Sequence, residues 1–139
     1  MIETRSATEA DAASVLAFWK EAAEGTSITD DIAGVTRLIG RDPDALILAE
    51  SDGLLVGTLI AGWDGWRASL YRLAVLPSHR RQGIAKTLLE RAEQRFLELG
   101  GRRGDAMVLV ENVQAQAAWA AAGYHQEDHW RRWVKPFDR

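Results

Sequence analysis

The chain has 139 residues, no cysteine and a formal net charge of -3 at pH 7, from 17 Lys and Arg against 20 Asp and Glu. This length suits one domain over residues 1–139, and the lack of cysteine excludes disulfides, thiolate zinc ligands and a cysteine nucleophile. Basic residues are spread among acids, and no segment resembles a secretory signal or a membrane span, so we expect a cytoplasmic protein that binds neither nucleic acid nor membrane and needs no metal.

The N-terminal segment predicts a strand followed by a helix. Ile2–Arg5 alternates in the manner of a short strand, and Thr8 with Asp11 three residues later forms a capping box. The apolar residues of the following helix recur at helical spacing and predict its buried face: Ala12, Val15, Leu16 and Trp19.

A second helix and three strands are expected next. After a loop at Gly25–Thr29, Asp30 or Asp31 caps a helix that ends at Gly40. Its apolar face consists of Ile32, Val35, Leu38 and Ile39. Three apolar segments then follow, with Asp-Gly dipeptides between them that favour tight turns, which predicts an antiparallel meander over Ala45–Glu50, Leu54–Gly62 and Trp66–Leu76.

The second half of the chain alternates strands and helices. Helical periodicity runs from Gly83 to Leu99 and stops at a Gly-Gly pair. A strand at Ala106–Val110, a helix at Gln114–Ala122 and a last strand at Trp130–Val134 are expected after it, with Tyr124–Gln126 as an optional short strand. Strand–helix–strand units imply a parallel pair and the hairpins imply antiparallel pairs, so the sheet should be mixed.

A basic turn with one glycine connects the third apolar segment to the long helix. It reads Arg80-Arg81-Gln82-Gly83-Ile84-Ala85-Lys86. Backbone N–H groups at a helix N-terminus lack partners within the helix and favour an anion, and Gly83 has no side chain to block a phosphate oxygen. The alternative is a solvated basic turn that merely starts a surface helix. The mononucleotide and dinucleotide glycine patterns are both missing.

Two motifs in this half resemble those of one family. Arg80-x-x-Gly83-x-Ala85, preceded by Leu73-Ala74-Val75, is similar to the acyl-CoA-binding motif of the GNAT superfamily of N-acetyltransferases. Asn112-x-x-Ala115 with the downstream Ala122-Gly123-Tyr124 is similar to a second motif of that superfamily, in the same order. The resemblance covers nearly the whole chain, and the hairpin Gly62–Arg67 looks like that of small bacterial single-domain members.

The resemblance implies a fold and an acyl-donor site. The fold is α/β (α+β), with a mixed, mostly antiparallel central sheet flanked by helices and a splayed parallel pair at the fourth and fifth strands. The main chain of Leu73, Ala74 and Val75 would bind the pantetheine arm of acetyl-CoA, and the Leu73 amide would polarise the thioester carbonyl. The residues expected to bind the pyrophosphate are Arg80, Arg81, Gln82, Gly83, Ile84, Ala85 and Lys86.

Two residues after the fifth strand have both a binding and a structural interpretation. Asn112 would contact the pantetheine arm, or it caps the next helix, and one side chain can do both. Trp119 stands where the family often has a tyrosine that protonates the departing thiolate. An indole N–H is a donor and no comparable acid, so Trp119 would pack on the cofactor or in the core. Water or Tyr124 would then supply the proton.

The general base is equally open in the sequence. An amine with a pKa near ~10.4 must lose a proton before it attacks a thioester. The family's glutamate on the fourth or fifth strand corresponds here to Ser69 or Met107, and neither is a base. Glu111, at the end of the fifth strand, and Asp64, in the hairpin, are the candidates. Their structural alternatives are a solvated strand end and a turn residue.

The acceptor side shows acids and indoles. Carboxylates around the loop between the first two helices would attract a cationic amine or simply solvate helix ends: Glu21, Glu24, Asp30 and Asp31. Four indoles would line an ammonium-binding pocket or bury a homodimer interface: Trp63, Trp66, Trp130 and Trp133.

These patterns favour an acetyl-CoA-dependent N-acetyltransferase that acts on an amine of a small molecule or peptide by direct attack in a ternary complex. The alternatives are a catalytically weak acyl-CoA-binding or regulatory module, which retains the basic turn without an acid or base, and a partner-binding domain with no cofactor.

Overall fold

The computed structural model describes residues 1–23 and 27–137. Within these residues the strands are β1 (Ile2–Ser6), β2 (Leu46–Ser51), β3 (Leu54–Trp63), β4 (Ala68–Val75) and β5 (Gly104–Ala106). The α-helices are α1 (Ala12–Ala22), α2 (Ile32–Arg41), α3 (Ile84–Glu98) and α4 (Val113–Ala121), and short 3-10 turns occur at Glu9–Asp11 and Pro77–His79. None of the helices in this described part is long and apolar enough to cross a membrane.

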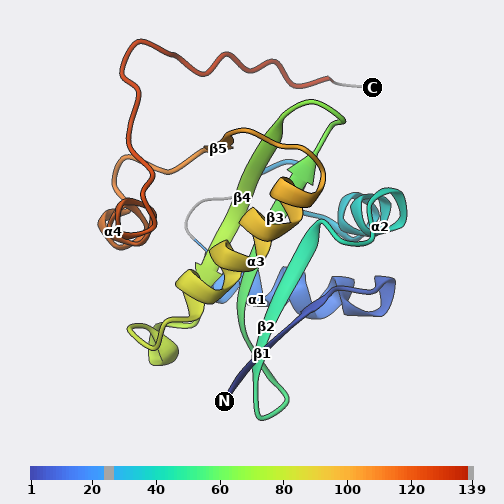
Figure 1. Cartoon of the computed structure of the whole chain (residues 1–139). Coiled ribbons are helices and arrows are strands. Elements are labelled where there is room, and N and C mark those ends of the chain that lie inside the picture. The colour runs from blue at the N-terminus through green and yellow to red at the C-terminus, as the bar shows by residue number, and fades with distance from the viewer. Residues whose placement is uncertain (24–26, 138–139) are drawn as a thin grey trace.

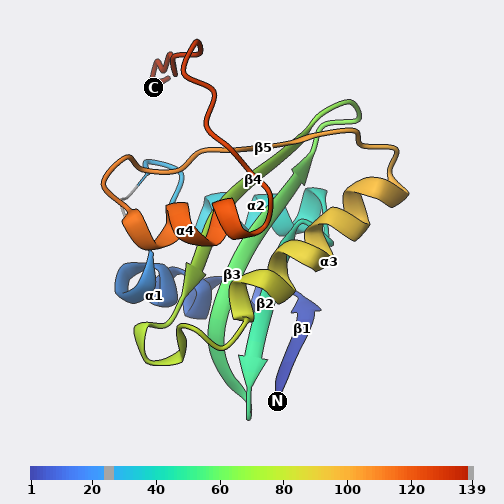
Figure 2. The same cartoon turned by 60° about the vertical axis from the view of Figure 1, so that its left-hand side comes forward.

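The strands form one mixed sheet in the order β1-β2-β3-β4-β5. The first three pairings are antiparallel, while β4 and β5 run parallel. Helix α3 lies on one face, α1 and α2 lie on the other, and α4 stands beside the β4 edge (Figures 1 and 2). This arrangement confirms the expected mixed, mostly antiparallel sheet flanked by helices, with its parallel pair at the fourth and fifth strands.

Apolar side chains of α3 pack against one face of the sheet. On α3 the buried positions are Ile84, Leu88, Leu89, Ala92 and Phe96. Helical periodicity predicts four of them, but it also predicts Ala85, which is half-buried, and Leu99, which is 42% exposed, and it misses Ile84. The helix approaches β3 closely at Gly57, because a Cβ added there would lie 2.8 Å from the Ile84 Cγ2 atom and 3.1 Å from the Leu88 Cδ1 atom. The lack of a side chain at Gly57 thus seats the first turn of α3 against the sheet.

The predicted helix caps are present. The Thr8 N–H donates to the Asp11 Oδ2 atom at 2.7 Å, and Arg5 donates to the same carboxylate at 2.8 Å. The Arg5 hydrogen bond is the main reason why the pKa of Asp11 lies well below its usual range. Asp31, rather than Asp30, caps α2, since its Oδ1 atom accepts from the Gly34 N–H at 2.6 Å.

Three details of the N-terminal half differ from the sequence prediction or cannot be compared with it. Ile32, predicted on the apolar face of α2, is 52% exposed. Leu16 is half-buried, whereas Phe18 and Ala22 join the buried face of α1. Of the predicted loop at Gly25–Thr29, Gly25 and Thr26 lie outside the described residues.

The fifth strand lies earlier and is shorter than predicted. The sheet pairs Gly104–Ala106, whereas the apolar run that predicted a strand at Ala106–Val110 pairs only at its first residue. Beyond it, the Gln116 Nε2 atom donates to the carbonyl oxygens of Leu109 and Val110 at 3.2 and 2.5 Å. The backbone there turns toward α4 instead of extending the sheet.

The predicted last strand is wrong for the described chain. Neither Trp130–Val134 nor Tyr124–Gln126 forms a strand, and Trp130, Trp133 and Val134 are exposed. Apolar alternation is a local signal, but a strand also needs a partner with free backbone groups at a sheet edge. With β5 limited to a few residues, the chain after α4 has no such partner within the described residues.

Candidate functional site

Strand β4 contains a bulge at Arg72 and Leu73. The β3–β4 register pairs Thr58 with Ala74 and Ile60 with Tyr71, so two β4 residues lie opposite Leu59 alone. Arg72 takes a left-handed φ of 55°, which is uncommon for a side chain with a Cβ. The Thr58 hydroxyl donates to the Arg72 carbonyl oxygen at 2.9 Å across this irregularity. The sequence analysis did not single out Thr58 or Arg72. A threonine within the otherwise apolar strand β3 was the signal that could have pointed to Thr58.

Beyond its third pair with β5, β4 has no strand partner on that edge among the described residues. Pairing with β5 runs only from Ala68↔Gly104 to Leu70↔Ala106. The predicted pantetheine-binding residues Leu73, Ala74 and Val75 lie past that point, with the Ala74 side chain buried and the other two half-buried. Backbone groups at an open strand edge bind an extended ligand as an added strand would. The structure therefore places these three residues where the two strands have separated.

The basic turn leads directly from this edge into α3. Gly83 is the N-cap, with a left-handed φ of 78° and no side-chain cap from the described residues. The Thr87 N–H donates to the Gly83 carbonyl at 3.0 Å, so the N–H groups of Ile84, Ala85 and Lys86 precede the first helical bond. A Cβ on Gly83 would meet no described atom within 4 Å. The open space above Gly83 is therefore bordered by three backbone donors and the positive end of the helix dipole.

One side chain of this turn is buried in the core, and the polar and basic ones are exposed or half-buried. Ile84 is 1% exposed and packs in the core. Arg81, Gln82 and Lys86 are exposed, and Arg80 is half-buried. Arg81 also takes a left-handed φ, of 66°, a conformation that costs roughly 1–2 kcal/mol for a residue with a Cβ. The arrangement can bind a doubly charged phosphate group through backbone donors, with the basic side chains around them.

The contacts of Asn112 and Trp119 are those of their structural interpretations. The Asn112 Oδ1 atom accepts from the Ala115 N–H at 3.0 Å and caps α4. Trp119 is 6% exposed and meets the Tyr124 ring edge-on, with 5.0 Å between ring centroids. The indole thus fixes α4 against the chain that follows it.

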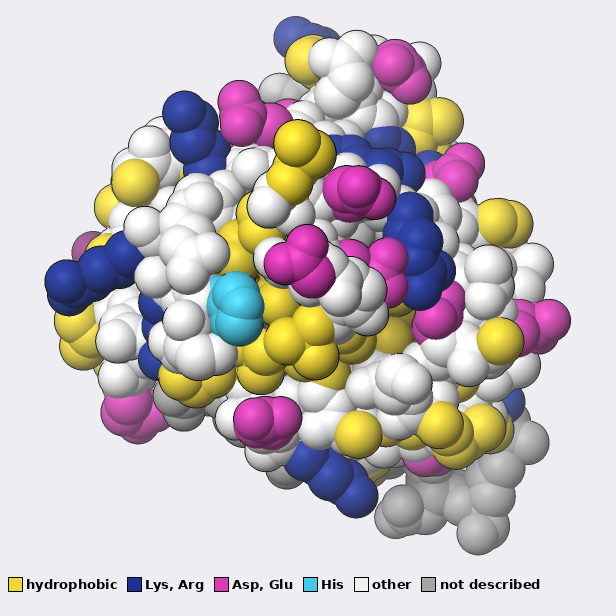
Figure 3. Space-filling view, turned by 90° about the horizontal axis from the view of Figure 1, so that it is seen from below, with side chains coloured by type: hydrophobic (Ala, Val, Ile, Leu, Met, Phe, Trp, Pro, Cys, Tyr) yellow, Lys and Arg dark blue, Asp and Glu magenta, His cyan; other side chains and the backbone are white. Residues whose placement is uncertain are grey.

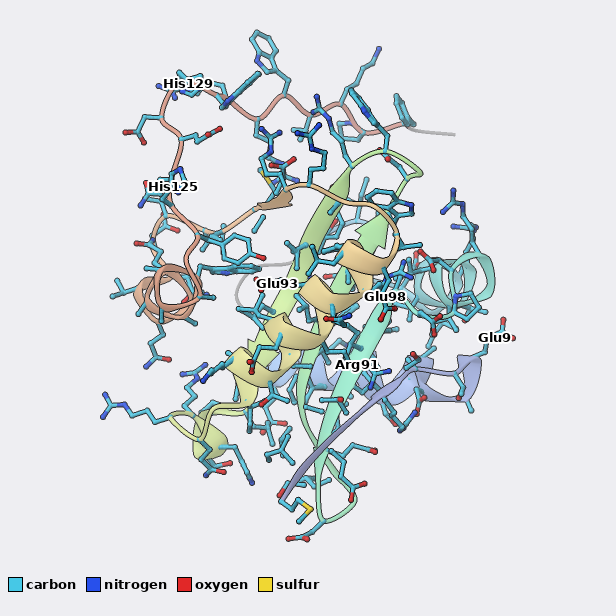
Figure 4. All side chains as sticks on the ribbon, viewed as in Figure 1. Glu9, Arg91, Glu93, Glu98, His125 and His129 are labelled. Atoms are coloured by element: carbon cyan, nitrogen blue, oxygen red, sulfur yellow. The ribbon has the colours of Figure 1, made fainter. Side chains whose placement is uncertain are left out.

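The Tyr124 phenol is committed to a carboxylate. Its hydroxyl donates to the Glu93 Oε2 atom at 2.8 Å, and Glu93 belongs to α3 (Figure 4). Burial, and then Glu93, raise the pKa of Tyr124 above its ordinary value. A phenol with a raised pKa is a weaker acid, so this geometry disfavours Tyr124 as the donor that protonates a departing thiolate.

The two candidate bases lie in different settings. Asp64 is a turn residue whose Oδ1 atom accepts from the Trp66 and Arg67 N–H groups at 2.7 and 2.6 Å, and these bonds lower its pKa. A carboxylate stabilised in this way is a poor base. The predicted position of Glu111 at the end of the fifth strand is wrong, since β5 ends at Ala106 and Glu111 lies exposed in the turn before α4. Its carboxylate meets no hydrogen-bond donor among the described residues.

The acids of the acceptor side have partners or other roles. Asp30 forms an ion pair with Arg72, whose guanidinium also lies over the Trp19 ring, 5.4 Å from its centroid. Asp31 is the α2 cap, and Glu24 lies outside the described residues. The segment between α1 and α2 is therefore tied to the β4 bulge by a charge pair.

Glu21 borders a hollow of about 440 Å³ between α1 and the β2–β3 hairpin. Apolar side chains, including Phe18 and Leu55, form its floor, and the Arg5–Asp11 and Arg5–Glu50 ion pairs flank it. Seen from below, this end of the molecule has an apolar centre with charged side chains around it (Figure 3). The hollow does not include the residues of the basic turn.

The four late and hairpin indoles do not gather into one pocket. Trp63 packs near Phe96, with 6.5 Å between ring centroids, and Trp66 carries the Arg67 guanidinium 4.4 Å above its ring. Trp130 and Trp133 lie on the chain after α4 and do not line the hollow that Trp63 and Trp66 border. A shared aromatic cage for an ammonium group is thus not formed by these residues.

Tyr124 should remain a neutral phenol at a pH where ordinary tyrosines ionise. The chain has two tyrosines, so the variant Tyr71→Phe leaves Tyr124 as the single phenol. Because the folded pKa is raised, we expect ionisation, followed by absorbance at alkaline pH, well above pH ~10, and Glu93→Gln should lower this midpoint. The stabilisation by this phenol is present below pH ~10 and is lost as pH rises toward the folded pKa. A midpoint near ~10 in Tyr71→Phe would contradict the Glu93 contact.

Comparison with known proteins agrees with this geometry. The acetyltransferase (GNAT) family model matches residues 12–124. An acetyltransferase of Pectobacterium atrosepticum is 32% identical over 111 residues, which cover 80% of this chain and 79% of the relative.

Solved structures show the same fold. The PaiA N-acetyltransferase of Thermoplasma acidophilum, in complex with coenzyme A, has a TM-score of 0.82 at 21% identity over 92% of both chains. The aminoglycoside 6'-N-acetyltransferase AAC(6')-IG of Acinetobacter haemolyticus has a TM-score of 0.78 at 21% identity over 98% of this chain and 99% of that one. With the family match, the open β4 edge and the glycine turn before α3, the chain belongs to the GNAT family of acetyltransferases.

Proposed function

We propose that this protein transfers the acetyl group of acetyl-CoA to an amine, by direct attack of the amine in a ternary complex. One observation carries the proposal: the bulged end of β4 has no strand partner on one edge among the described residues, and the chain then passes through the 3-10 turn and the basic turn to the N-terminus of α3, where no described side chain caps the backbone N–H groups. An extended arm and a pyrophosphate follow each other in coenzyme A in the same way. Family membership and the relative crystallised with coenzyme A support this assignment.

In this proposal, backbone groups and basic side chains bind different parts of acetyl-CoA. The N–H groups at Ile84, Ala85 and Lys86 bind the pyrophosphate, with Arg80, Arg81 and Gln82 around it. The main chain of Leu73, Ala74 and Val75 binds the pantetheine arm along the open β4 edge. Asn112, the half-buried N-cap of α4, contacts the pantetheine arm in this proposal.

The Leu73 N–H stabilises the negative charge that grows on the carbonyl oxygen as the amine attacks. Glu111 accepts the amine proton, directly or through water, because its carboxylate has no donor among the described residues. With Trp119 a hydrogen-bond donor only and Tyr124 bound to Glu93, water protonates the departing thiolate.

The acceptor is an amine of a small molecule or of a peptide. The aminoglycoside acetyltransferase among the solved structures favours a small molecule. The ion pair between Asp30 and Arg72 already neutralises one acid of the acceptor side, so recognition of a cation has to use other groups there. The cytoplasmic location expected from the sequence remains a prediction.

The second candidate is an acyl-CoA-binding module with weak catalysis. Specific observations favour it: Met107 replaces a glutamate of the family, Trp119 replaces the tyrosine, and Tyr124 is bound to Glu93. Such a module would bind coenzyme A as well as an enzyme does. Release of coenzyme A with a panel of amines separates the two functions.

Gly83→Glu should abolish tight binding of coenzyme A, because the new side chain places a negative charge in the space above the N-cap. We expect calorimetric titration to show an affinity for coenzyme A weaker by about 100-fold or more, which corresponds to a binding free energy loss of roughly 2.8 kcal/mol. The control is Gly100→Glu, which creates a similar left-handed residue, at a φ of 88°, just beyond the other end of α3. Equal losses in both variants would mean that helix strain, and not the phosphate site, is responsible.

Glu111→Gln should slow acetyl transfer most strongly near neutral pH. Loss of a general base costs about 100-fold or more, and the deficit should shrink as the pH approaches the amine pKa near ~10.4. Asp64→Asn keeps an oxygen for the turn and should change kcat/KM less than about twofold, within the small effect of a surface substitution. A rate of Glu111→Gln that matches wild type across the pH range would remove Glu111 from the mechanism.

We also propose that the exposed indoles after α4 become buried in the interface of a homodimer. Trp130 and Trp133 are 68% and 91% exposed, and Phe137 follows them with 86% exposure. Light scattering coupled to size exclusion should give a dimer mass for wild type and a monomer mass for Trp130→Ser/Trp133→Ser. Trp66→Ser removes an equally exposed indole from the hairpin and should leave the mass unchanged. A monomer mass for wild type at high concentration would rule the dimer out.

A further inference from the structure

Thr58 is the single buried polar side chain among the described residues, and it lies in the middle of β3. Its hydroxyl accepts a hydrogen bond from the Trp19 Nε1 atom at 2.9 Å and donates one to the Arg72 carbonyl oxygen at 2.9 Å. Trp19 comes from α1 and is itself only 6% exposed. The three groups therefore form two consecutive hydrogen bonds, from the Trp19 indole through the Thr58 hydroxyl to the carbonyl oxygen of the bulged β4 peptide.

The Arg72 carbonyl and the Leu73 N–H belong to the same peptide group. That group is planar and trans, since the described residues contain no cis peptide, so its N–H points opposite to its C=O. Thr58 directs the carbonyl toward β3. The Leu73 N–H consequently points away from β3, on the side of β4 that β5 leaves uncovered after Leu70.

The contact changes the strength of this donor as well as its direction. A hydrogen bond accepted by an amide carbonyl withdraws electrons from the amide and makes its N–H a better donor. The Thr58 hydroxyl is in turn polarised by the Trp19 N–H that it accepts. Because Thr58 is fully buried and Trp19 is only 6% exposed, water does not compete with the bond between them, while the bond to the Arg72 carbonyl is part-buried.

The bulge is also restrained through the Arg72 side chain. A left-handed residue with a Cβ persists only where its surroundings hold it. The Arg72 guanidinium lies over the Trp19 ring and forms an ion pair with Asp30 of the segment between α1 and α2. Trp19 thus touches the bulge both through the ring and, by way of Thr58, through the peptide.

We infer that Trp19 and Thr58 are positioning residues for acyl transfer, which form a buried hydrogen-bond relay that aims and polarises the Leu73 N–H. The inference rests on the proposed function, in which this N–H binds the thioester carbonyl of acetyl-CoA. Neither residue touches the substrate. Their effect is confined to the carbonyl oxygen and should leave the binding of the pyrophosphate unchanged.

The test compares Thr58→Val, which keeps the shape and removes the hydroxyl, with Thr58→Ser, which restores it. Thr4→Val is the matched control, because Thr4 lies on β1, which β2 and β3 separate from β4 in the sheet. Its hydroxyl accepts from Arg91 on α3 at 2.9 Å. Infrared difference spectra of bound acetyl-CoA labelled with ¹³C at the thioester carbonyl report its polarisation without any acceptor. Titration with coenzyme A, which lacks that carbonyl, reports binding alone.

We expect the carbonyl stretch of the bound thioester to lie at lower frequency than in solution for wild type, Thr58→Ser and Thr4→Val. In Thr58→Val most of this shift should be lost, while the affinity for coenzyme A stays within about twofold of wild type, less than 0.5 kcal/mol. With an amine found by the panel, kcat should fall about 10-fold at unchanged KM, less than the 10²–10³-fold seen when such a donor is deleted.

The outcomes separate the relay from the function on which it rests. If wild type fails to bind coenzyme A, both are overturned. If coenzyme A binds and the stretch is the same in Thr58→Val as in wild type, the relay alone is overturned, even where that variant is less stable. Should Thr58→Val not fold, Trp19→Phe removes the first donor and must show a smaller shift loss of the same sign, and an unchanged stretch there would refute the relay.

Discussion

The separation of β4 from β5 is the constraint on which the site depends. The two strands pair over three positions and then part, so the last residues of β4 keep one edge free while their other edge is held by β3. Backbone donors and acceptors at a free edge need a partner, and an extended ligand supplies one. The turn that follows β4 opens into α3, so the helix N-terminus is delivered at the end of the same edge.

This arrangement requires α3 to be held firmly. Gly57 lets the first helical turn approach β3, and Ile84, within the turn proposed to bind the pyrophosphate, is buried against it. At the other end of the helix, Arg95 donates to the Ala61 carbonyl oxygen at 3.2 Å and pairs with Asp42 at 2.6 Å. A binding turn built mainly of backbone groups is only as well placed as the helix that carries it, so these apolar and ionic contacts serve the site as well as the core.

The aromatic side chains near the second motif make structural contacts. Tyr124 stabilises the junction of α3 and α4 through Glu93, and Trp119 packs against it, so the aromatic residues nearest to the second motif are used for structure. In the mechanism that we propose, the polarising group is instead a backbone N–H, and we infer that its direction is set by neighbours that do not reach the substrate. A mutation in α1 or β3 can thus change the reaction without touching the acyl donor.

Many helices, strands and turns of the fold could be predicted from the sequence. Helical periodicity predicted α3 nearly to the residue, and the Asp-Gly pairs marked both hairpins. The glycine turn with its arginines indicated the family, and the phosphate site predicted there is part of the proposed function. Caps, turns and periodicity are local properties, so they follow from neighbouring residues. The family motif also pointed to Leu73, although the proposed role of its amide stays a prediction.

What only the tertiary structure decided involves partners distant along the chain. The strands expected at Ala106–Val110 and Trp130–Val134 have the composition of strands, but no sheet edge pairs with the second, and the first pairs only through Ala106. The ion pair of Asp30 with Arg72, the phenol bond of Tyr124 to Glu93 and the buried relay from Trp19 through Thr58 to the β4 bulge likewise join residues far apart in the sequence. Each depends on how the helices are laid on the sheet, and a pattern within one segment cannot encode a contact whose other half lies in another.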